Sequence, residues 1–93
     1  MDVTVQDNPD RRRFEILLDG EVAGFADYQA RDGAVVIVHS EVDPAYRGKG
    51  LGGQLAQQTL DALRERAVKV VPACPFFARY VADHPEYQEI VVQ

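Results

Sequence analysis

The sequence predicts an α+β fold in one domain, residues 1–93: an antiparallel meander of four strands, a helix, a fifth strand and a second, shorter helix. Three observations predict this order. Four segments with alternating or β-branched apolar residues come first, separated by short turns. A long amphipathic helical segment follows, and a short apolar run comes after it. A helix between two strands forms a crossover, so the fifth strand should lie parallel to the fourth.

Turn residues separate the four strands of the predicted meander. Asn8-Pro9-Asp10 follows the first strand, Asp19-Gly20 is a hairpin signal after the second, and Arg31-Asp32-Gly33 follows the third. Asp43-Pro44 ends the fourth, because proline cannot donate to a strand ladder. Short connections of this kind join antiparallel neighbours. The predicted strands are residues 3–5, 14–18, 22–28 and 34–42.

The second half of the chain begins with a helix over residues 50–66. Its apolar stripe repeats at helical spacing and consists of Leu51, Leu55, Ala56, Thr59 and Leu63, widened by Leu60. Residues 69–73 then form the fifth strand, and residues 76–82 form the shorter helix, which His84-Pro85 ends. Residues 89–92 predict a final edge strand.

Composition excludes several classes of protein. A net charge of −5 and a pI of about 4.8 argue against a general nucleic-acid binder. No apolar run approaches the roughly 20 residues of a membrane span. A single cysteine excludes an internal disulfide and fits a reducing compartment, and the N-terminal residues carry no apolar signal segment, so we expect a cytoplasmic protein. Two histidines and one cysteine lack ligand spacing, so no metal is expected.

A glycine-rich loop with two cations precedes the longer helix, in the stretch Arg47-Gly48-Lys49-Gly50-Leu51-Gly52-Gly53. The first N–H groups of a helix lack intrahelical partners, and the helix dipole is positive there, so glycines allow a phosphate group to approach closely. A P-loop is excluded because no Lys-Ser/Thr pair follows Gly50. The dinucleotide fingerprint G-x-G-x-x-G is matched literally, but its context of continuing parallel sheet is missing.

A third pattern, R/Q-x-x-G-x-G/A at the start of a helix, fits this loop fully through Arg47, Gly50 and Gly52. In motif, strand order and position along the chain, the sequence resembles the GNAT superfamily of acetyl-CoA-dependent N-acetyltransferases. The resemblance implies a minimal GNAT fold, in which the fifth strand is splayed from the fourth. It also implies that coenzyme A is bound by Val42, Arg47, Gly48, Lys49, Gly50, Leu51, Gly52 and Gly53.

Further motifs resemble those of small, single-domain GNAT-like proteins, and this likeness covers nearly the whole chain. They are His39-Ser40-Glu41-Val42, Pro72-x-Cys74-Pro75-Phe76, Tyr80 and His84-Pro85-Glu86-Tyr87. Ser40 is often threonine in that group, a substitution that keeps a hydroxyl. The family resemblance implies that Tyr80 protonates the departing thiolate of coenzyme A, which suits a phenol with a pKa of about 10. The alternative is a half-buried aromatic residue.

Three more residues are candidates for catalysis. Cys74 lies where the fifth strand meets a helix N-terminus, which lowers the pKa of a thiol, and His39 on the fourth strand is a possible base for it. Cys74 then forms an acetyl-cysteine intermediate, or else it is a small buried apolar residue. Glu41 resembles the carboxylate with which GNAT enzymes deprotonate the acceptor amine. His39 and Glu41 share one strand face, which is either catalytic or merely solvated.

The helices that GNAT enzymes place between their first two strands are missing here. The acceptor side should therefore be open, or completed by a partner or a second copy, which fits a large acceptor such as a protein amine. We expect an N-acetyltransferase that uses acetyl-CoA and needs no metal, either a monomer or a weak homodimer, with no nucleic-acid or membrane partner. The alternative is a non-catalytic acyl-CoA-binding or regulatory module.

Overall fold

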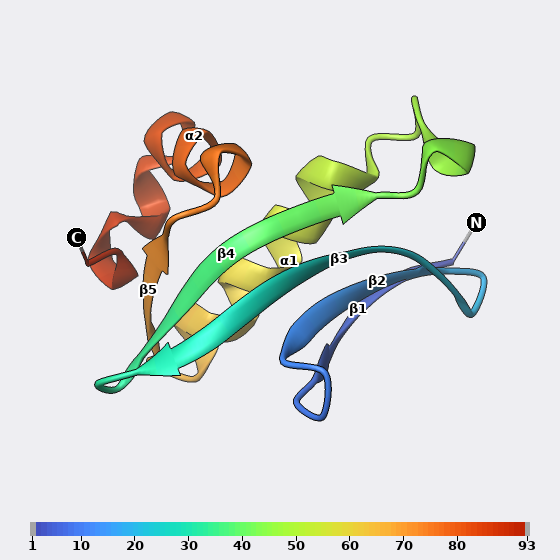
Figure 1. The fold of residues 1–93 in the computed structure, drawn as a ribbon. Coiled ribbons are helices and arrows are strands. Elements are labelled where there is room, and N and C mark those ends of the chain that lie inside the picture. Colours follow the sequence, from blue (N-terminus) through green and yellow to red (C-terminus); the bar gives the residue numbers. More distant parts are fainter. Residues whose placement is uncertain (1, 93) are drawn as a thin grey trace.

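The computed structural model describes residues 2–92 (Figure 1). Its strands are β1 (Val3–Asn8), β2 (Arg13–Leu18), β3 (Glu21–Arg31), β4 (Ala34–Val42) and β5 (Lys69–Pro72). Its helices are α1 (Leu51–Glu65) and α2 (Pro75–Asp83), and its 3-10 segments are η1 (Pro44–Tyr46) and η2 (Pro85–Ile90). This content and order confirm the predicted α+β class. None of the helices in residues 2–92 has the length and apolar character to cross a membrane.

The five strands form one sheet in the order β1-β2-β3-β4-β5, antiparallel except for the parallel pair of β4 and β5. The predicted meander and the parallel fifth strand are therefore confirmed. Asp19-Gly20 and Asp32-Gly33 form the two tight hairpins, and all four of these residues have positive φ. This geometry matches the twist of the flanking strands, so β3 continues to Arg31, three residues beyond its predicted end.

α1 packs across one face of the sheet, behind β3 and β4 in Figure 1. Its buried stripe is the one predicted: Leu51, Leu55, Ala56, Thr59, Leu60 and Leu63. The sheet meets it with Phe14, Ile16 and Leu18 of β2 and Ile37 of β4, all buried. Within the described residues, the opposite face of β1–β3 carries no helix (Figure 1). The sheet therefore has a packed face and a helix-free face, and we use these two terms below.

The predicted edge strand over residues 89–92 is wrong. The chain forms η2 over Pro85–Ile90 instead, and only a single parallel bridge joins Val91 to Val70. Tyr87 and Ile90, three residues apart, are both buried, and a 3-10 helix places residues at this spacing on one side. Pro85 starts the segment because its fixed φ suits a helix start. The fourth strand has the predicted bounds, Ala34–Val42, and the other boundaries differ from the prediction by at most three residues.

Candidate active site

The glycine loop leads into α1 through two left-handed residues. Gly48 and Gly50 have φ of 85° and 71°, and Gly50 is the N-cap of α1 without any side-chain cap. An added Cβ would meet nothing at either position, so backbone conformation, not lack of space, requires glycine there. The first helical hydrogen bond runs from Gln54 N–H to Gly50 C=O at 3.3 Å. The N–H groups of residues 51–53 therefore precede the helical ladder.

Two adjoining hollows lie between this loop and the last residues of β4. The larger, about 250 Å³, is lined by Val42, Tyr46, Arg47, Gly48, Gly50, Leu51 and Gly52. The smaller, about 170 Å³, which we call the narrow part, is lined by Ser40, Glu41, Val42, Gly52, Leu55 and Phe76. Val42 and Gly52 line both parts, so we treat them as one and call it the β4 groove. Of the residues predicted to bind coenzyme A, Lys49 and Gly53 line neither part.

β4 and β5 diverge beside the narrow part of the groove. They pair only from Ala34 with Lys69 to Ile37 with Pro72, and Cys74 N–H then donates to Ile37 C=O at 2.8 Å. β4 continues to Val42 while the chain after β5 turns away into α2 (Figure 1). This is the splay that the resemblance implied. It frees one backbone edge of residues 38–42 from the strand ladder.

A β-bulge in β4 decides which side chains face the groove. Asp27 of β3 pairs with His39, but the next residue, Tyr28, pairs with Ile37, so Val38 is an extra residue. Buried Ile37 lies on the packed face, and without the bulge strict alternation would place His39 on that face as well. The bulge reverses the alternation. Ser40 and Val42 therefore line the groove, while the His39 and Glu41 side chains are on the other face.

Ser40, not His39, is the β4 residue whose side chain contacts the Cys74 thiol. The Cys74 Sγ lies 3.3 Å from the Ser40 Oγ, and the cysteine is 4% exposed at the N-cap of α2. Burial alone would raise the pKa of this thiol. Hydrogen bonds from the Ser40 hydroxyl and from backbone groups of Phe77, Phe76 and Ser40 outweigh it and lower the pKa below its ordinary value. The thiol of Cys74 therefore loses its proton more readily than an ordinary cysteine, and this effect comes from Ser40 and backbone groups, not from an imidazole.

His39 and Glu41 form a separate pair on the helix-free side of β4. The His39 Nε2 lies 3.5 Å from the Glu41 Oε1, and their side chains are 56% and 60% exposed. They share one face, as strand alternation predicted. Glu41 also lines the narrow part of the β4 groove, whereas His39 does not. The Glu41 side chain itself is on the helix-free face, so Glu41 borders the groove at the strand edge, and it is the only one of the two candidate bases that does so.

Tyr80 lies one helical turn beyond Phe76 on α2. Its ring stacks on His84 with centroids 3.9 Å apart, and it lines a hollow next to the β4 groove that shares Phe76 with it. Burial raises the pKa of Tyr80, and the charges of Asp61 and Glu86 raise it further. The phenol therefore stays protonated at neutral pH, which a proton donor requires.

The arrangement can now be compared with known proteins. A family model described as GCN5-related N-acetyl-transferase matches residues 13–90. The chain belongs to this family. Protein NATD1 of Mus musculus is 30% identical over 86 residues, which are 89% of this chain and 77% of that protein. Protein NATD1 of Danio rerio is 29% identical over 93 residues, 95% of this chain and 84% of its own.

Solved structures show that the fold of this chain is shared with other GCN5-related proteins. A GCN5-like protein from Staphylococcus aureus matches 96% of this chain and 87% of its own, with a TM-score of 0.70 at 20% identity, which shows a shared fold alone. The ribosomal-protein-S18-alanine N-acetyltransferase from Escherichia coli matches 63% of this chain with a TM-score of 0.56 at 31% identity. That match spans 40% of the Escherichia coli enzyme. The resemblance to GNAT enzymes is thus confirmed at the level of family and fold.

Two residues of the candidate site were not predicted to have a role. Ser40 was noted only as a motif residue, yet it contacts the thiol of Cys74. Phe76 closes the narrow part of the groove, is 47% exposed, and would stand 3.4 Å from a Cβ added at Gly52. The one signal for Phe76 in the sequence is that it is a large apolar residue two positions after a helix N-cap.

Proposed function

We propose that this chain transfers an acetyl group from acetyl-CoA to an amine. The observation that carries the proposal is the β4 groove, which begins at the N-terminus of α1 and ends beside Cys74. The free N–H groups and the dipole of α1 attract the diphosphate of coenzyme A, and Arg47 and Lys49 add positive charge to a protein of net charge −5. The narrow part of the groove suits the thioester arm.

The backbone of β4 gives the pantetheine arm a place to bind. Beyond Ile37 the strand has lost β5 as a neighbour, so its N–H and C=O groups up to Val42 can pair with the amides of the arm as with an added strand. Leu55 and Phe76 supply apolar contacts on the other side. The thioester carbon is then held near Ser40 and Glu41.

The transfer needs one base and one acid. Glu41 takes a proton from the acceptor ammonium, directly or through a water molecule, and the amine nitrogen then forms a bond to the thioester carbon. The carbon–sulfur bond breaks, the leaving thiolate takes a proton from Tyr80, and the acylated nitrogen loses its second proton, which restores the Tyr80 phenol. In the covalent variant, the Cys74 thiolate first attacks the thioester carbon and coenzyme A leaves as the thiol; the amine then attacks the acetyl carbon and the Cys74 thiolate is released. The helix-free face leaves room for a large acceptor, such as an amine on a protein.

Calorimetry with acetyl-CoA and chromatographic measurement of released coenzyme A test the proposal together. Glu41→Gln should bind acetyl-CoA as wild type does and lose about 10²- to 10⁴-fold in transfer rate, the usual contribution of a general base. The matched control is Glu65→Gln, which neutralises an exposed carboxylate at the far end of α1 and should change neither.

Cys74→Ala separates the two routes, because covalent transfer ends with it and direct transfer survives. An acetyl adduct on Cys74 in a rapidly quenched sample would establish the covalent route. Binding without transfer to any amine would identify a non-catalytic acyl-CoA-binding module instead. Absence of binding at millimolar acetyl-CoA would overturn the proposal altogether.

A further inference from the structure

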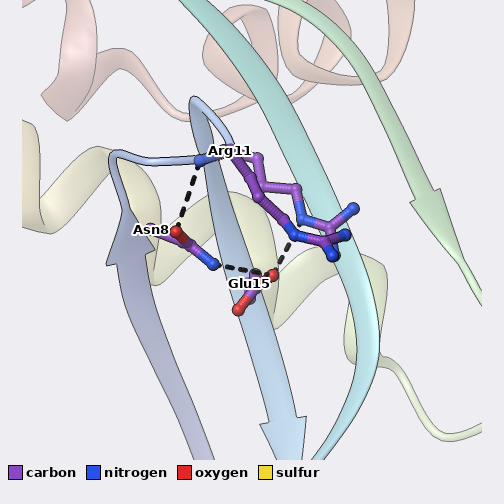
Figure 2. Close-up of polar contacts among 4 residues, drawn as sticks. Asn8, Arg11 and Glu15 are labelled. Atoms are coloured by element: carbon purple, nitrogen blue, oxygen red, sulfur yellow. Dashed lines mark hydrogen bonds and ion pairs between the residues drawn. The ribbon is translucent and has the colours of Figure 1, made fainter.

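The helix-free face of the sheet holds a buried ion pair between Glu15 and Arg13. Figure 2 shows Glu15 beside Asn8, with a dashed line between their side chains. Glu15 is only 4% exposed, although no described helix covers it. Its Oε2 accepts a hydrogen bond from Arg13 Nε at 2.8 Å and a weaker one from Asn8 Nδ2 at 3.4 Å. The Arg13 side chain is 20% exposed, and its guanidinium carbon lies 4.7 Å from the centre of the Phe25 ring. Arg13 is therefore fixed by a carboxylate and by an aromatic face.

Stability does not explain why a charged pair is placed here. A buried ion pair usually stabilises a fold no more than well-packed apolar residues of the same volume. The pair is nevertheless fully ionised: burial would raise the pKa of Glu15, but the bonds from Arg13 and Asn8 lower it below its ordinary value. With Nε directed to Glu15, Arg13 retains two Nη groups with four N–H donors. A guanidinium held in this way is suited to bind a second carboxylate in two-pronged fashion.

Arg13 lines a pocket that adjoins the β4 groove. The pocket, about 420 Å³, is also lined by Phe25, Glu41, Val42 and Asp43. Glu41 and Val42 line the narrow part of the groove as well, so a molecule in the pocket would lie next to the thioester. β3 lies between β2 and β4, so Arg13 borders the pocket from one side and the two carboxylates border it from the other. The pocket thus has a cationic side and an anionic side.

We propose that the acceptor is an amine that also carries a carboxylate, with the carboxylate on Arg13 and the amine beside Glu41. The inference rests on the proposed function and names the class of its acceptor. A diamine would bring its second cation against Arg13, so the pocket discriminates against it. Glu15 acts as a positioning residue, because it reaches the acceptor only through Arg13. The carboxylate can belong to a free amino acid or to an acidic residue next to a peptide N-terminus.

Matched acceptors test this with acetyl-CoA and the full chain. Cadaverine is lysine without its carboxylate, so this pair isolates the proposed contact for free amino acids. Two peptides that differ only in having Glu or Gln after the N-terminal residue isolate the same carboxylate contact for peptide acceptors. We expect a preference of about 10- to 100-fold in kcat/KM for the carboxylate-bearing member of at least one pair, since hydrogen bonds to charged groups contribute about 1.5–3 kcal/mol.

The Arg13→Met/Glu15→Leu double variant should abolish this preference. The double change is needed because Arg13→Met alone leaves Glu15 buried without a partner and can unfold the protein. Arg31→Met, an exposed arginine at the far end of β3, is the matched control and should keep the preference. Equal rates for both members of both pairs, a preference for cadaverine, or a preference that survives the double variant would overturn the inference while leaving acetyl transfer intact.

A binding measurement keeps the inference testable if no amine is acetylated. The Arg13 Nε–H resonance should shift saturably when lysine is added to the protein with coenzyme A, and it should not shift with cadaverine. If glutamyl peptides are the source, they should shift this resonance and their glutaminyl counterparts should not. Absence of any such shift would refute the carboxylate site, whereas absence of coenzyme A binding would refute the proposed function.

Discussion

Gly53 allows a sharp test of the coenzyme A site, because folding and binding should respond to its substitution in opposite directions. It is the third residue of α1, its φ is not positive, and an added Cβ would meet no atom within 4 Å. Glycine in a helix is less favourable than alanine by about 0.5–1 kcal/mol. Gly53→Ala should therefore raise the melting temperature of the free protein by about 2–8 °C, as expected for a domain of this size.

Binding of coenzyme A should weaken in the same variant. Gly53 does not line the β4 groove, but a helical Cβ tilts toward the helix N-terminus, so a methyl group at position 53 would project toward the N–H groups of residues 51–53, where we propose that the diphosphate binds. Crowding of this kind typically costs about 1–3 kcal/mol. The dissociation constant should therefore rise by about 5- to 150-fold.

Thermal unfolding without ligand and calorimetric titration with coenzyme A measure the two effects separately. Gly33→Ala is the control with the opposite pattern: Gly33 has φ of 78° in the hairpin at the far end of β4, so alanine should destabilise the fold and leave the dissociation constant unchanged. If Gly53→Ala is more stable and binds coenzyme A as tightly as wild type, the diphosphate does not lie at the N-terminus of α1 and the reasoning fails.

Three further predictions concern the surrounding structure. Ser40→Ala should slow alkylation of Cys74 at neutral pH about tenfold, because the lost hydrogen bond to the thiolate raises the thiol pKa; an unchanged rate would contradict this. Gly24→Ala should lower the free energy of unfolding by about 2–4 kcal/mol in urea titrations, since its Cβ would stand 2.6 Å from the backbone oxygen of Glu41. The Tyr28 hydroxyl donates to an Asp7 oxygen at 2.6 Å, and burial together with this bond raises the pKa of Tyr28 to about 12. Because the folded pKa is the higher one, this stabilisation is complete below about pH 10 and is lost as pH rises toward 12, so Tyr28→Phe should lose less stability over that range.

The fold was largely predictable from the sequence because its signals are local. Aspartate-glycine pairs set the two hairpins, and the apolar spacing of α1 identifies both its length and its buried side. The glycines at positions 48 and 50 marked the loop correctly, since their left-handed conformations are strongly disfavoured for other residues. Each of these features depends on residues close together in the chain.

The faces of β4 were not predictable in the same way. Val38 lies in a run of β-branched residues, and nothing in that run distinguishes a bulged residue from a paired one. The sequence therefore predicted His39 as the residue beside the Cys74 thiol, whereas the structure places Ser40 there. The burial of Glu15 was also hidden, because the cover comes from Arg13 and Phe25, and the second of these lies on another strand.

The extra residue in β4 also determines how this strand can tolerate length changes. Removing Val38 would shift the phase of residues 39–42 by one, exchanging a serine and a valine that face the interior for an imidazole and a carboxylate. A charged group would then press against the aliphatic side of α1. Single-residue deletions should therefore be tolerated far less here than in the turn after β1, where no downstream side chain would have to change sides.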